Sequence, residues 1–332
     1  MGTKVAIISL GGTISMGKKE INGGVSPSLT ADDLFKLIPE DIIKKRNIFI
    51  KPITYKLVPG SALDFVDLIN LSNMIKKLLG YEGYDGIIIT QGTTTIEETA
   101  FFLDLVLDYE NPIIVTGAMR NPTLPGYDGI ANLIDSILVA ANKETWGLGV
   151  LVVMGGEIHS ARYVQKTHNS RINAFTSYPG ILGWIIEDRV SLILKPVKKL
   201  PKFKINETMA NKKVCMYMTY IGDDGVALEK LASICDGIVL VSFAGGAVPP
   251  RVSDIAKRIA VEKPVVFAGR ARRGEIPLRT YSFIGSEIDL ISGGLIPARS
   301  LDPVKARVLL YVLLASGYSK SEIYNIISNW NY

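Results

Sequence analysis

The sequence predicts an α/β protein with a larger N-terminal domain, built on a parallel sheet with helices on both faces, and a smaller C-terminal α/β domain. The first observation is that short β-branched runs alternate with helix-length patterns, as at 84–89 and 96–107. The second is that this alternation stops in a Lys/Pro-rich stretch and then resumes. The third is that 332 residues, 48% of them hydrophobic, are enough for two cores. We therefore expect domains at 1–188 and 213–332, joined by a linker at 189–212.

In the N-terminal domain, the expected strands and helices follow one another regularly. Residues 4–10 are an apolar run that predicts a buried strand, and Thr30 is placed to cap a helix over 31–38. The other expected strands are 48–57, 84–89, 112–116 and 149–154, and the other expected helices are 65–79, 96–107 and 131–142. Residues 16–30, rich in Gly, Lys and Ser, indicate either a mobile flap over a site or an ordinary surface loop.

The C-terminal domain repeats the same alternation on a smaller scale. Its expected strands are 214–220, 237–243 and 264–268, and its expected helices are 227–234, 252–261, 303–316 and 320–328. No internal repeat and no low-complexity tract interrupts this pattern. The domain is therefore expected to be a second open α/β unit.

The charge of the chain does not favour a polyanionic partner. The net charge is +5 without a long basic block, and the nearest to one is 195–204, where five lysines surround two prolines as in a solvated linker. No apolar run reaches transmembrane length, and the N-terminus enters a strand without the features of a signal peptide. We therefore expect a cytoplasmic protein that binds neither nucleic acid nor a membrane.

The usage of cysteine and of glutamine gives weaker indications about metal binding, disulfides and the growth temperature of the source. Cys215 and Cys235 are too few for a disulfide framework and lack the spacing of a metal site. Glutamine is nearly absent, with only Gln91 and Gln165, while lysine and isoleucine are plentiful. That usage is typical of a thermophile's avoidance of labile amides.

The segment with the most candidate functional side chains is Thr90-Gln91-Gly92-Thr93-Thr94-Thr95, which lies between an expected strand and an expected helix. In an open parallel sheet, this edge is the usual position for a ligand, because backbone N–H groups and side chains point into a crevice there. The alternative is that one threonine simply caps the helix. A cap needs one hydroxyl, whereas three follow the glycine.

Other strand ends contribute Thr13 and Ser61, and a later loop contributes Lys166. The two histidines, His159 and His168, do not complete a Ser-His-Asp set and make a poor metal site. A lysine held among threonines and partly desolvated has a lowered pKa and can serve as the base for a threonine nucleophile. Backbone N–H groups at the Gly11-Gly12 and Gly92 turns would form the oxyanion hole. The alternative is that Lys166 is an ordinary solvent-exposed lysine.

At these residues, the chain resembles the bacterial-type L-asparaginases and glutaminases. Gly11-Gly12-Thr13-Ile14 is similar to the first threonine motif of that family, and Thr90–Ala100 is similar to its second, T-H-G-T-D-T-x-E-E-T-A. The later blocks that match are Gly117-Ala118-Met119-Arg120, Asp128-Gly129 with Asn132-Leu133, Arg162–Thr167, Leu295-Ile296-Pro297 and Leu301–Arg307. The matches run through both expected domains in the right order.

The resemblance implies a role for each candidate residue. Thr13 would be the nucleophile of one threonine pair, and Thr93 would be the second catalytic threonine, with Lys166 as its base. Ser61 would bind the α-carboxylate of the substrate, and the substrate pocket would also include Gly12, Gly92, Thr94 and Ala118. The family needs no metal and no organic cofactor. Its members form an intimate dimer whose partner completes each active site, so we expect a homodimer or a dimer of dimers.

Three departures from the family pattern concern recognition of the substrate. Thr94 stands where the family has an aspartate that binds the substrate's ammonium group and supports the catalytic threonine and lysine. The first tyrosine of the chain is Tyr55, so the expected flap lacks the family's tyrosine. Residues 243–249 read FAGGAVP where the family typically has G-x-G-N-G. Loss of a carboxylate partner from a desolvated ammonium costs about 3 kcal/mol, or about a hundredfold in affinity.

We therefore expect an amidohydrolase that releases ammonia from asparagine or a related small amide through an acyl-threonine intermediate. One alternative is a family member whose substrate has an α-amine that is absent, acylated or recognised differently. Another is a non-catalytic relative that binds a small ligand. A glutaminase-like subunit that passes ammonia to a transfer-RNA amidotransferase is disfavoured, because such subunits carry an extra N-terminal domain and the first strand here starts at Lys4.

Overall fold

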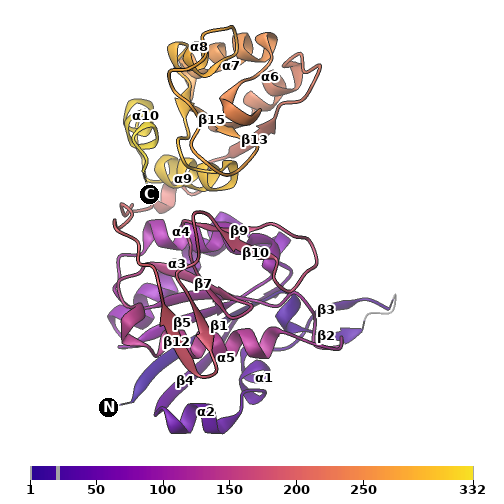
Figure 1. The fold of residues 1–332 in the computed structure, drawn as a ribbon, viewed down its shortest axis with the longest axis vertical. Coiled ribbons are helices and arrows are strands. Elements are labelled where there is room, and N and C mark those ends of the chain that lie inside the picture. Colours follow the sequence, from indigo (N-terminus) through magenta and orange to yellow (C-terminus); the bar gives the residue numbers. More distant parts are fainter. Residues whose placement is uncertain (1, 20–22, 332) are drawn as a thin grey trace. The chain divides into compact units, whose positions relative to one another are not determined.

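The computed structural model describes residues 2–19 and 23–331, and these fall into two compact units with the boundary between Lys202 and Phe203 (Figure 1). Each unit is an α/β structure with its own sheet, and the N-terminal unit is the larger. The boundary lies inside the expected linker, 189–212, but the first four residues of that segment, Arg189–Leu192, form strand β12 of the first sheet. The linker is thus shorter than its composition indicates. No helix in the described ranges is long and apolar enough to cross a membrane.

The first unit contains twelve of the strands and five of the α-helices that the structure describes. Its strands are β1 (Thr3–Gly11), β2 (Met16–Lys19), β3 (Val25–Pro27), β4 (Ile48–Val58), β5 (Gly86–Thr90), β6 (Ile113–Thr116), β7 (Val150–Met154), β8 (Glu157–Ser160), β9 (Val164–Lys166), β10 (Phe175–Ser177), β11 (Gly183–Ile186) and β12. Its helices are α1 (Ala31–Lys36), α2 (Glu40–Lys45), α3 (Phe65–Gly80), α4 (Ile96–Val106) and α5 (Gly129–Ala140).

The main sheet of this unit has eight strands in the order β12-β11-β8-β7-β6-β5-β1-β4. Strands β4, β1, β5, β6 and β7 are parallel, and β8, β11 and β12 extend the sheet in antiparallel fashion. The chain leaves β1 for β4 on one side and returns to β5 on the other. Strand β1 therefore lies at a topological switch point, where the carboxyl ends of neighbouring strands form a crevice.

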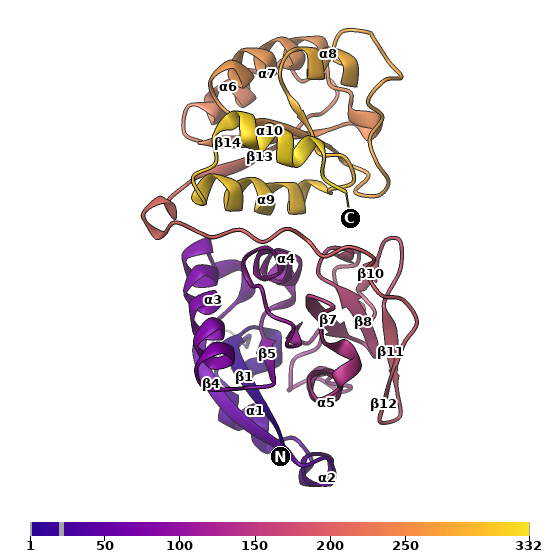
Figure 2. The same ribbon diagram turned by 90° about the vertical axis from the view of Figure 1, so that its left-hand side faces the viewer.

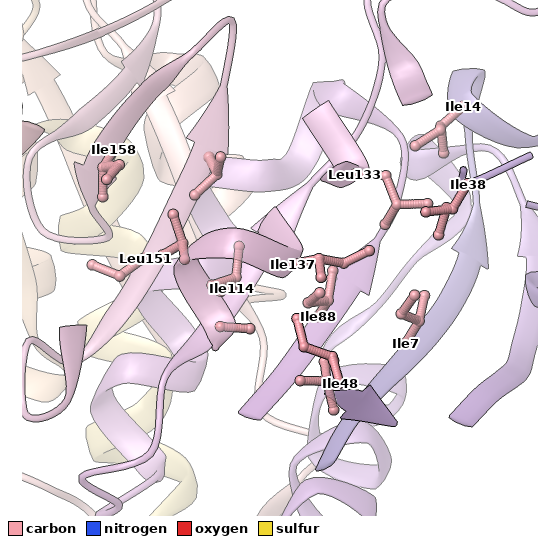
Figure 3. Close-up of a cluster of buried hydrophobic side chains, with 14 of the residues drawn as sticks. Ile7, Ile14, Ile38, Ile48, Ile88, Ile114, Leu133, Ile137, Leu151 and Ile158 are labelled. Carbon is pink, nitrogen blue, oxygen red and sulfur yellow. The ribbon is translucent and has the colours of Figure 1, made fainter. Parts of the chain in front are cut away.

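Helices cover both faces of this sheet, as the sequence predicts. On one face, a continuous core joins side chains of α1 and α5 to alternate residues of the strands, among them Leu34, Leu133, Ile137, Ile7 and Ile88 (Figure 3). On the other face, α4 packs against β6 and β7, and α3 packs against α4. Residues of both faces are fully buried, because a parallel sheet in this position has no solvated side.

The second unit is built on a four-stranded parallel sheet in the sequential order β13-β14-β15-β16. Its strands are β13 (Val214–Met218), β14 (Gly237–Ser242), β15 (Val265–Gly269) and β16 (Ile296–Pro297), and its helices are α6 (Val226–Ala232), α7 (Pro250–Glu262), α8 (Glu287–Ser292), α9 (Pro303–Ala315) and α10 (Lys320–Ser328). Helix α9 packs across β13, β14 and β15, while α6 and α7 lie over the opposite face (Figure 2).

Most expected helices and strands are present, but short elements set by tertiary pairing were not predicted. These are the helices α2 and α8 and the strands β2, β3, β16 and β8 to β12. The expected flap at 16–30 begins with the antiparallel pair β2 and β3, while its residues 20–22 lie outside the described residues. Thr30 caps α1 as expected, accepting from the backbone N–H of Asp33 in a capping box.

Two features of the connecting regions differ from their sequence-based interpretation. Cys215 and Cys235 form a disulfide that ties β13 to the segment after α6, with the two Cα atoms 6.1 Å apart. The lysine-rich segment 195–204 is only partly solvated, since Lys202 donates to the buried carboxylate of Asp104 and Leu200 is buried. A basic segment of this kind can be solvated on one side while its other side packs on the domain.

Candidate active site

Three glycines bring the carboxyl ends of β1, β4 and β5 into direct backbone contact. A Cβ atom on Gly12 would overlap the backbone nitrogen of Gly92, and one on Gly92 would lie 2.5 Å from the nitrogen of Gly60. Gly12 also has a φ angle of +78°, which residues with a side chain rarely adopt. The three strand ends can therefore approach this closely only because all three positions lack a side chain.

Thr93 and Lys166, two of the expected site residues, meet at this junction. Thr93 directly follows Gly92 and is 5% exposed, and the Lys166 side-chain nitrogen Nζ donates a hydrogen bond to its Oγ1 at 2.9 Å. Lys166 ends strand β9, which packs beside α4. Lys166 is thus half-buried, and its amine is bonded to Thr93 and not only to solvent.

Burial lowers the pKa of the Lys166 amine, and the negative charge of Glu97 acts in the opposite direction. The backbone N–H of Lys166 donates to Glu97 Oε1 at 2.7 Å. Glu97 lies in the first turn of α4, four residues after Thr93. We refer to Thr93, Lys166 and Glu97 as the reacting end of the site.

Thr13 enters the site from β1, in a short 3₁₀ turn (Thr13–Ser15) that starts directly after Gly12. The turn is held by its neighbours: the hydroxyl of Tyr127 donates to the carbonyl oxygen of Ile14 at 2.8 Å. Burial raises the pKa of the Tyr127 phenol, so the hydroxyl stays protonated as a donor. Because Gly12 abuts Gly92, Thr13 and Thr93 flank the same backbone junction.

Ser61 and Thr94 lie on two 3₁₀ turns, Gly60–Ala62 and Thr93–Thr95, that pack against each other. A Cβ on Gly60 would lie 2.7 Å from Thr94 Oγ1, so the Thr94 hydroxyl sits beside the residue that precedes Ser61. Both side chains are exposed, in contrast to Thr93. We refer to Ser61 and Thr94 as the recognition rim.

The other threonines of the segment 90–95, Thr90 and Thr95, lie in positions that support the fold of the junction. Thr95 is the N-cap residue of α4, but its hydroxyl makes no capping bond and donates instead to the carbonyl of Gly60 at 3.1 Å. The side-chain nitrogen of Gln91 donates to Thr95 Oγ1 at 3.2 Å. Thr90 is fully buried at the end of β5. The helix-cap alternative therefore does not account for these threonines, because Thr95 links two strand ends.

Ala118 lies fully buried in the loop that follows β6, and a network fixes that loop. The Asp128 carboxylate accepts from the backbone N–H of Met119 at 3.0 Å, and Asn132 Nδ2 donates to the carbonyl of Gly117 at 3.0 Å. Both polar residues are themselves buried at the start of α5. The loop is therefore rigid where it reaches the junction, since a Cβ on Gly117 would lie 2.6 Å from the carbonyl oxygen of Gln91.

Sequence reasoning did not assign roles to Glu97 and Tyr127. Glu97 lies in the second threonine motif, and the signal that could have pointed to it is its place in the first turn of the helix that follows Thr93. Nothing in the sequence pointed to Tyr127, because its contact with Ile14 spans 113 positions. Among the described residues, no three His, Cys, Asp or Glu side chains are grouped as a metal site. His159 is buried beside Ser177, and burial lowers its pKa to about 4.

Both units of the chain are similar in sequence to known asparaginases. Residues 4–198 match the family described as "Asparaginase, N-terminal", and residues 213–327 match the "Glutaminase/Asparaginase C-terminal domain". A curated relative, the L-asparaginase of Bacillus licheniformis, is 33% identical over 95% of this chain and 97% of its own length. A probable L-asparaginase of Deinococcus radiodurans is 37% identical over 78% of this chain and 79% of its own.

A solved structure extends the similarity to the fold. The crystal structure of a probable cytoplasmic L-asparaginase from Campylobacter jejuni superposes with a TM-score of 0.85 and 31% identity, covering 97% of this chain and 98% of the other. The similarity thus spans both units and every strand end described above.

Proposed function

The chain belongs to the asparaginase/glutaminase family and is an asparaginase-like amidohydrolase, and from this premise we propose that it works through a threonine nucleophile activated by Lys166. The contact that carries the proposal is the hydrogen bond between Lys166 Nζ and Thr93 Oγ1. A lysine whose pKa is lowered by burial can be neutral when it meets a hydroxyl, which is the state that a general base needs.

The proposed reaction has two halves. A threonine Oγ–H loses its proton to the neutral amine while its oxygen bonds to the amide carbon and the carbonyl electron pair moves onto oxygen. Backbone N–H groups at the Gly12 and Gly92 turns are the candidate donors to that oxyanion. Collapse breaks the C–N bond, and ammonia leaves with the proton. Water then cleaves the acyl-threonine, again with proton transfer through Lys166. Thr13 and Thr93 are the two candidate nucleophiles at the shared junction.

The substrate we propose is asparagine or a related small amide. Ser61 is the candidate partner of a carboxylate, and Thr94 beside it offers a hydroxyl and no charge. A second candidate follows from that observation: an amide whose α-amine is absent or acylated, because such a substrate brings no ammonium charge to the recognition rim. Saturable release of ammonia is the expected result for either substrate, whereas a non-catalytic, ligand-binding relative would release none.

The test of the mechanism is a double-mutant cycle. Lys166→Met and Thr93→Val should each keep the native circular dichroism spectrum and lower kcat by about 10⁴-fold or more, because each removes one member of a single unit. The double variant should be no slower than either single variant. Native-like turnover in Lys166→Met would remove the lysine from the mechanism. Additive losses would mean that the two residues act independently.

We also propose a homodimer or a dimer of dimers in the cytoplasm of a thermophile. The cytoplasmic assignment is supported by the Campylobacter jejuni relative, which is described as probable cytoplasmic. The Cys215–Cys235 disulfide supports the thermophile, because cytoplasmic disulfides are rare in mesophiles and common in some hyperthermophiles. Light scattering of the purified protein tests the oligomeric state, and its unfolding temperature tests the thermal origin.

A further inference from the structure

Lys166 is held at two points by one short segment of chain. Its side-chain Nζ donates to Thr93 Oγ1 at 2.9 Å, and its backbone N–H donates to Glu97 Oε1 at 2.7 Å. Thr93 and Glu97 are four residues apart, in the 3₁₀ turn after β5 and the first turn of α4. A displacement of α4 relative to β9 would therefore disturb both contacts together.

The carboxylate of Glu97 is buried, with 7% of the residue exposed. A buried charge costs free energy unless nearby groups compensate for it. Its position at the start of α4 supplies part of that compensation, since the helix N-terminus favours negative charge. The backbone N–H of Lys166 supplies another part. Glu97 is thus a buried carboxyl group that is bonded directly to the backbone of the lysine.

The charged groups around Lys166 can be named element by element. Strand β9 pairs with β10, whose residues Phe175–Ser177 are not ionisable, and it packs against α4. Helix α4 carries Glu97, Glu98 and Asp104, and Asp104 forms an ion pair with Lys202. Burial lowers the pKa of Lys166, and the charge that opposes this effect is that of Glu97.

We propose that Glu97 is a positioning residue of the reaction: it holds Lys166 against Thr93 and stabilises the ammonium that forms when Lys166 takes the Thr93 proton. The inference rests on the proposed function, in which Lys166 is the base. In this step, the amine is neutral before the transfer and positively charged after it; the charge of Glu97 favours the charged amine, and its carboxylate is bonded to the backbone N–H of the same residue. That attraction exists only once the proton has moved, so it favours the transferred state over the starting state.

Glu97→Gln separates the charge from the geometry, because the amide oxygen still accepts the backbone N–H of Lys166. We expect kcat to fall about 10- to 100-fold. The acid limb of the pH profile of kcat/KM should also move to lower pH. The limb moves in this direction because activity rises as Lys166 loses its proton, and removal of the negative charge lowers the pH at which that loss occurs.

Two further variants keep the test specific. Glu97→Asp retains the charge but shortens the side chain, so kcat should fall while the acid limb stays closer to its native position than in Glu97→Gln. Glu98→Gln makes the same charge change one residue along the helix, at a more exposed position where solvent screens it. Its acid limb should remain at the native pH.

Native kcat and a native acid limb in Glu97→Gln would overturn the inference. A fall in kcat without any movement of the limb would also overturn it, because that result describes a structural role alone. The same assay includes Lys166→Met. Turnover in that variant rejects Lys166 as the base. If Lys166→Met is inactive and the acid limb of the pH profile of Glu97→Gln stays at the native pH, only the role of Glu97 is rejected.

Discussion

Thr93 and Ser61 both follow parallel strands of one sheet and lie within the same small junction, but their surroundings differ. Thr93 is 5% exposed and is bonded to a lysine that is itself anchored to a buried carboxylate. Ser61 is exposed on a three-residue turn, and the neighbouring Thr94 is exposed as well. The reacting end is therefore fixed by packing, whereas the recognition rim consists of side chains that the fold leaves free to vary.

This difference separates the chemistry from the choice of substrate. A substitution at the reacting end must preserve a backbone junction, a buried charge and a hydrogen bond at the same time. A substitution at the rim changes one exposed group and leaves the packing as it is. In the proposed function, the threonine at position 94 is a change of this kind: it bears on recognition of the substrate, while the hydrogen bond between Lys166 and Thr93 is present beside it.

The largest effect is expected from Gly12→Ala, which would show that the reacting end depends on the glycine junction. The added Cβ would overlap the backbone of Gly92, which cannot rotate away, and the residue would be held at a positive φ. We expect no measurable turnover, and we expect the free energy of unfolding to fall by on the order of 3 kcal/mol or more. Thermal unfolding measures the loss of stability.

Gly83→Ala is the matched control for that variant. Gly83 has a φ of +67° but nothing within 4 Å of a Cβ, and it precedes the amino end of β5, at the edge of the sheet opposite the site. It carries the conformational strain alone, at about 1 kcal/mol, and should leave turnover unchanged. Equal losses of stability in the two variants would mean that strain, and not the contact between strand ends, explains the glycine at position 12.

A smaller effect is expected from Thr94→Asp, which tests whether the rim determines the substrate. The carboxylate would give the α-ammonium of asparagine a charged partner, so KM for L-asparagine should fall about 10- to 100-fold. The kcat value should change less than KM, because the exposed Thr94 side chain lies beside Gly60 and takes no part in the hydrogen bond between Lys166 and Thr93. Steady-state ammonia release measures both constants.

Thr94→Asn controls for shape, since it has nearly the size of aspartate and no charge. It should leave KM for asparagine close to the native value. If Thr94→Asn and Thr94→Asp lower KM equally, charge is not the missing element. If neither variant changes KM, the ammonium is bound elsewhere in the pocket, and the contrast between the two regions is weaker than we infer.

The regular part of the fold could be predicted because hydrophobic periodicity determines it. The parallel strands β1, β4, β5, β6 and β7 are apolar runs of four to eleven residues, and their lengths agree with the sequence to within a few positions. The antiparallel strands after β7 were not predicted, because they are three or four residues long and exist only through their pairing. The disulfide could not be predicted either, since it depends on how close β13 lies to the end of α6.

The site was predictable to a similar extent. Thr13, Ser61 and Thr93 could be singled out because each follows an expected strand, at the edge where open parallel sheets bind ligands. Lys166 was singled out from a later loop, with its role implied by the family resemblance. The contact between Lys166 and Thr93 spans 73 positions and is visible only in the structure. The role of Glu97 depends on which way the first turn of a helix faces, and this cannot be read from one sequence.

The most direct test of the central claim is ammonia release by the native protein from L-asparagine, L-glutamine, D-asparagine and N-acetyl-L-asparagine, each over a concentration series. We expect saturable release from at least one of these amides, and the ratio of kcat/KM between asparagine and its acylated form reports on the recognition rim. Release from none of them would contradict the account, because a reacting end held in this way would then serve only to bind a ligand.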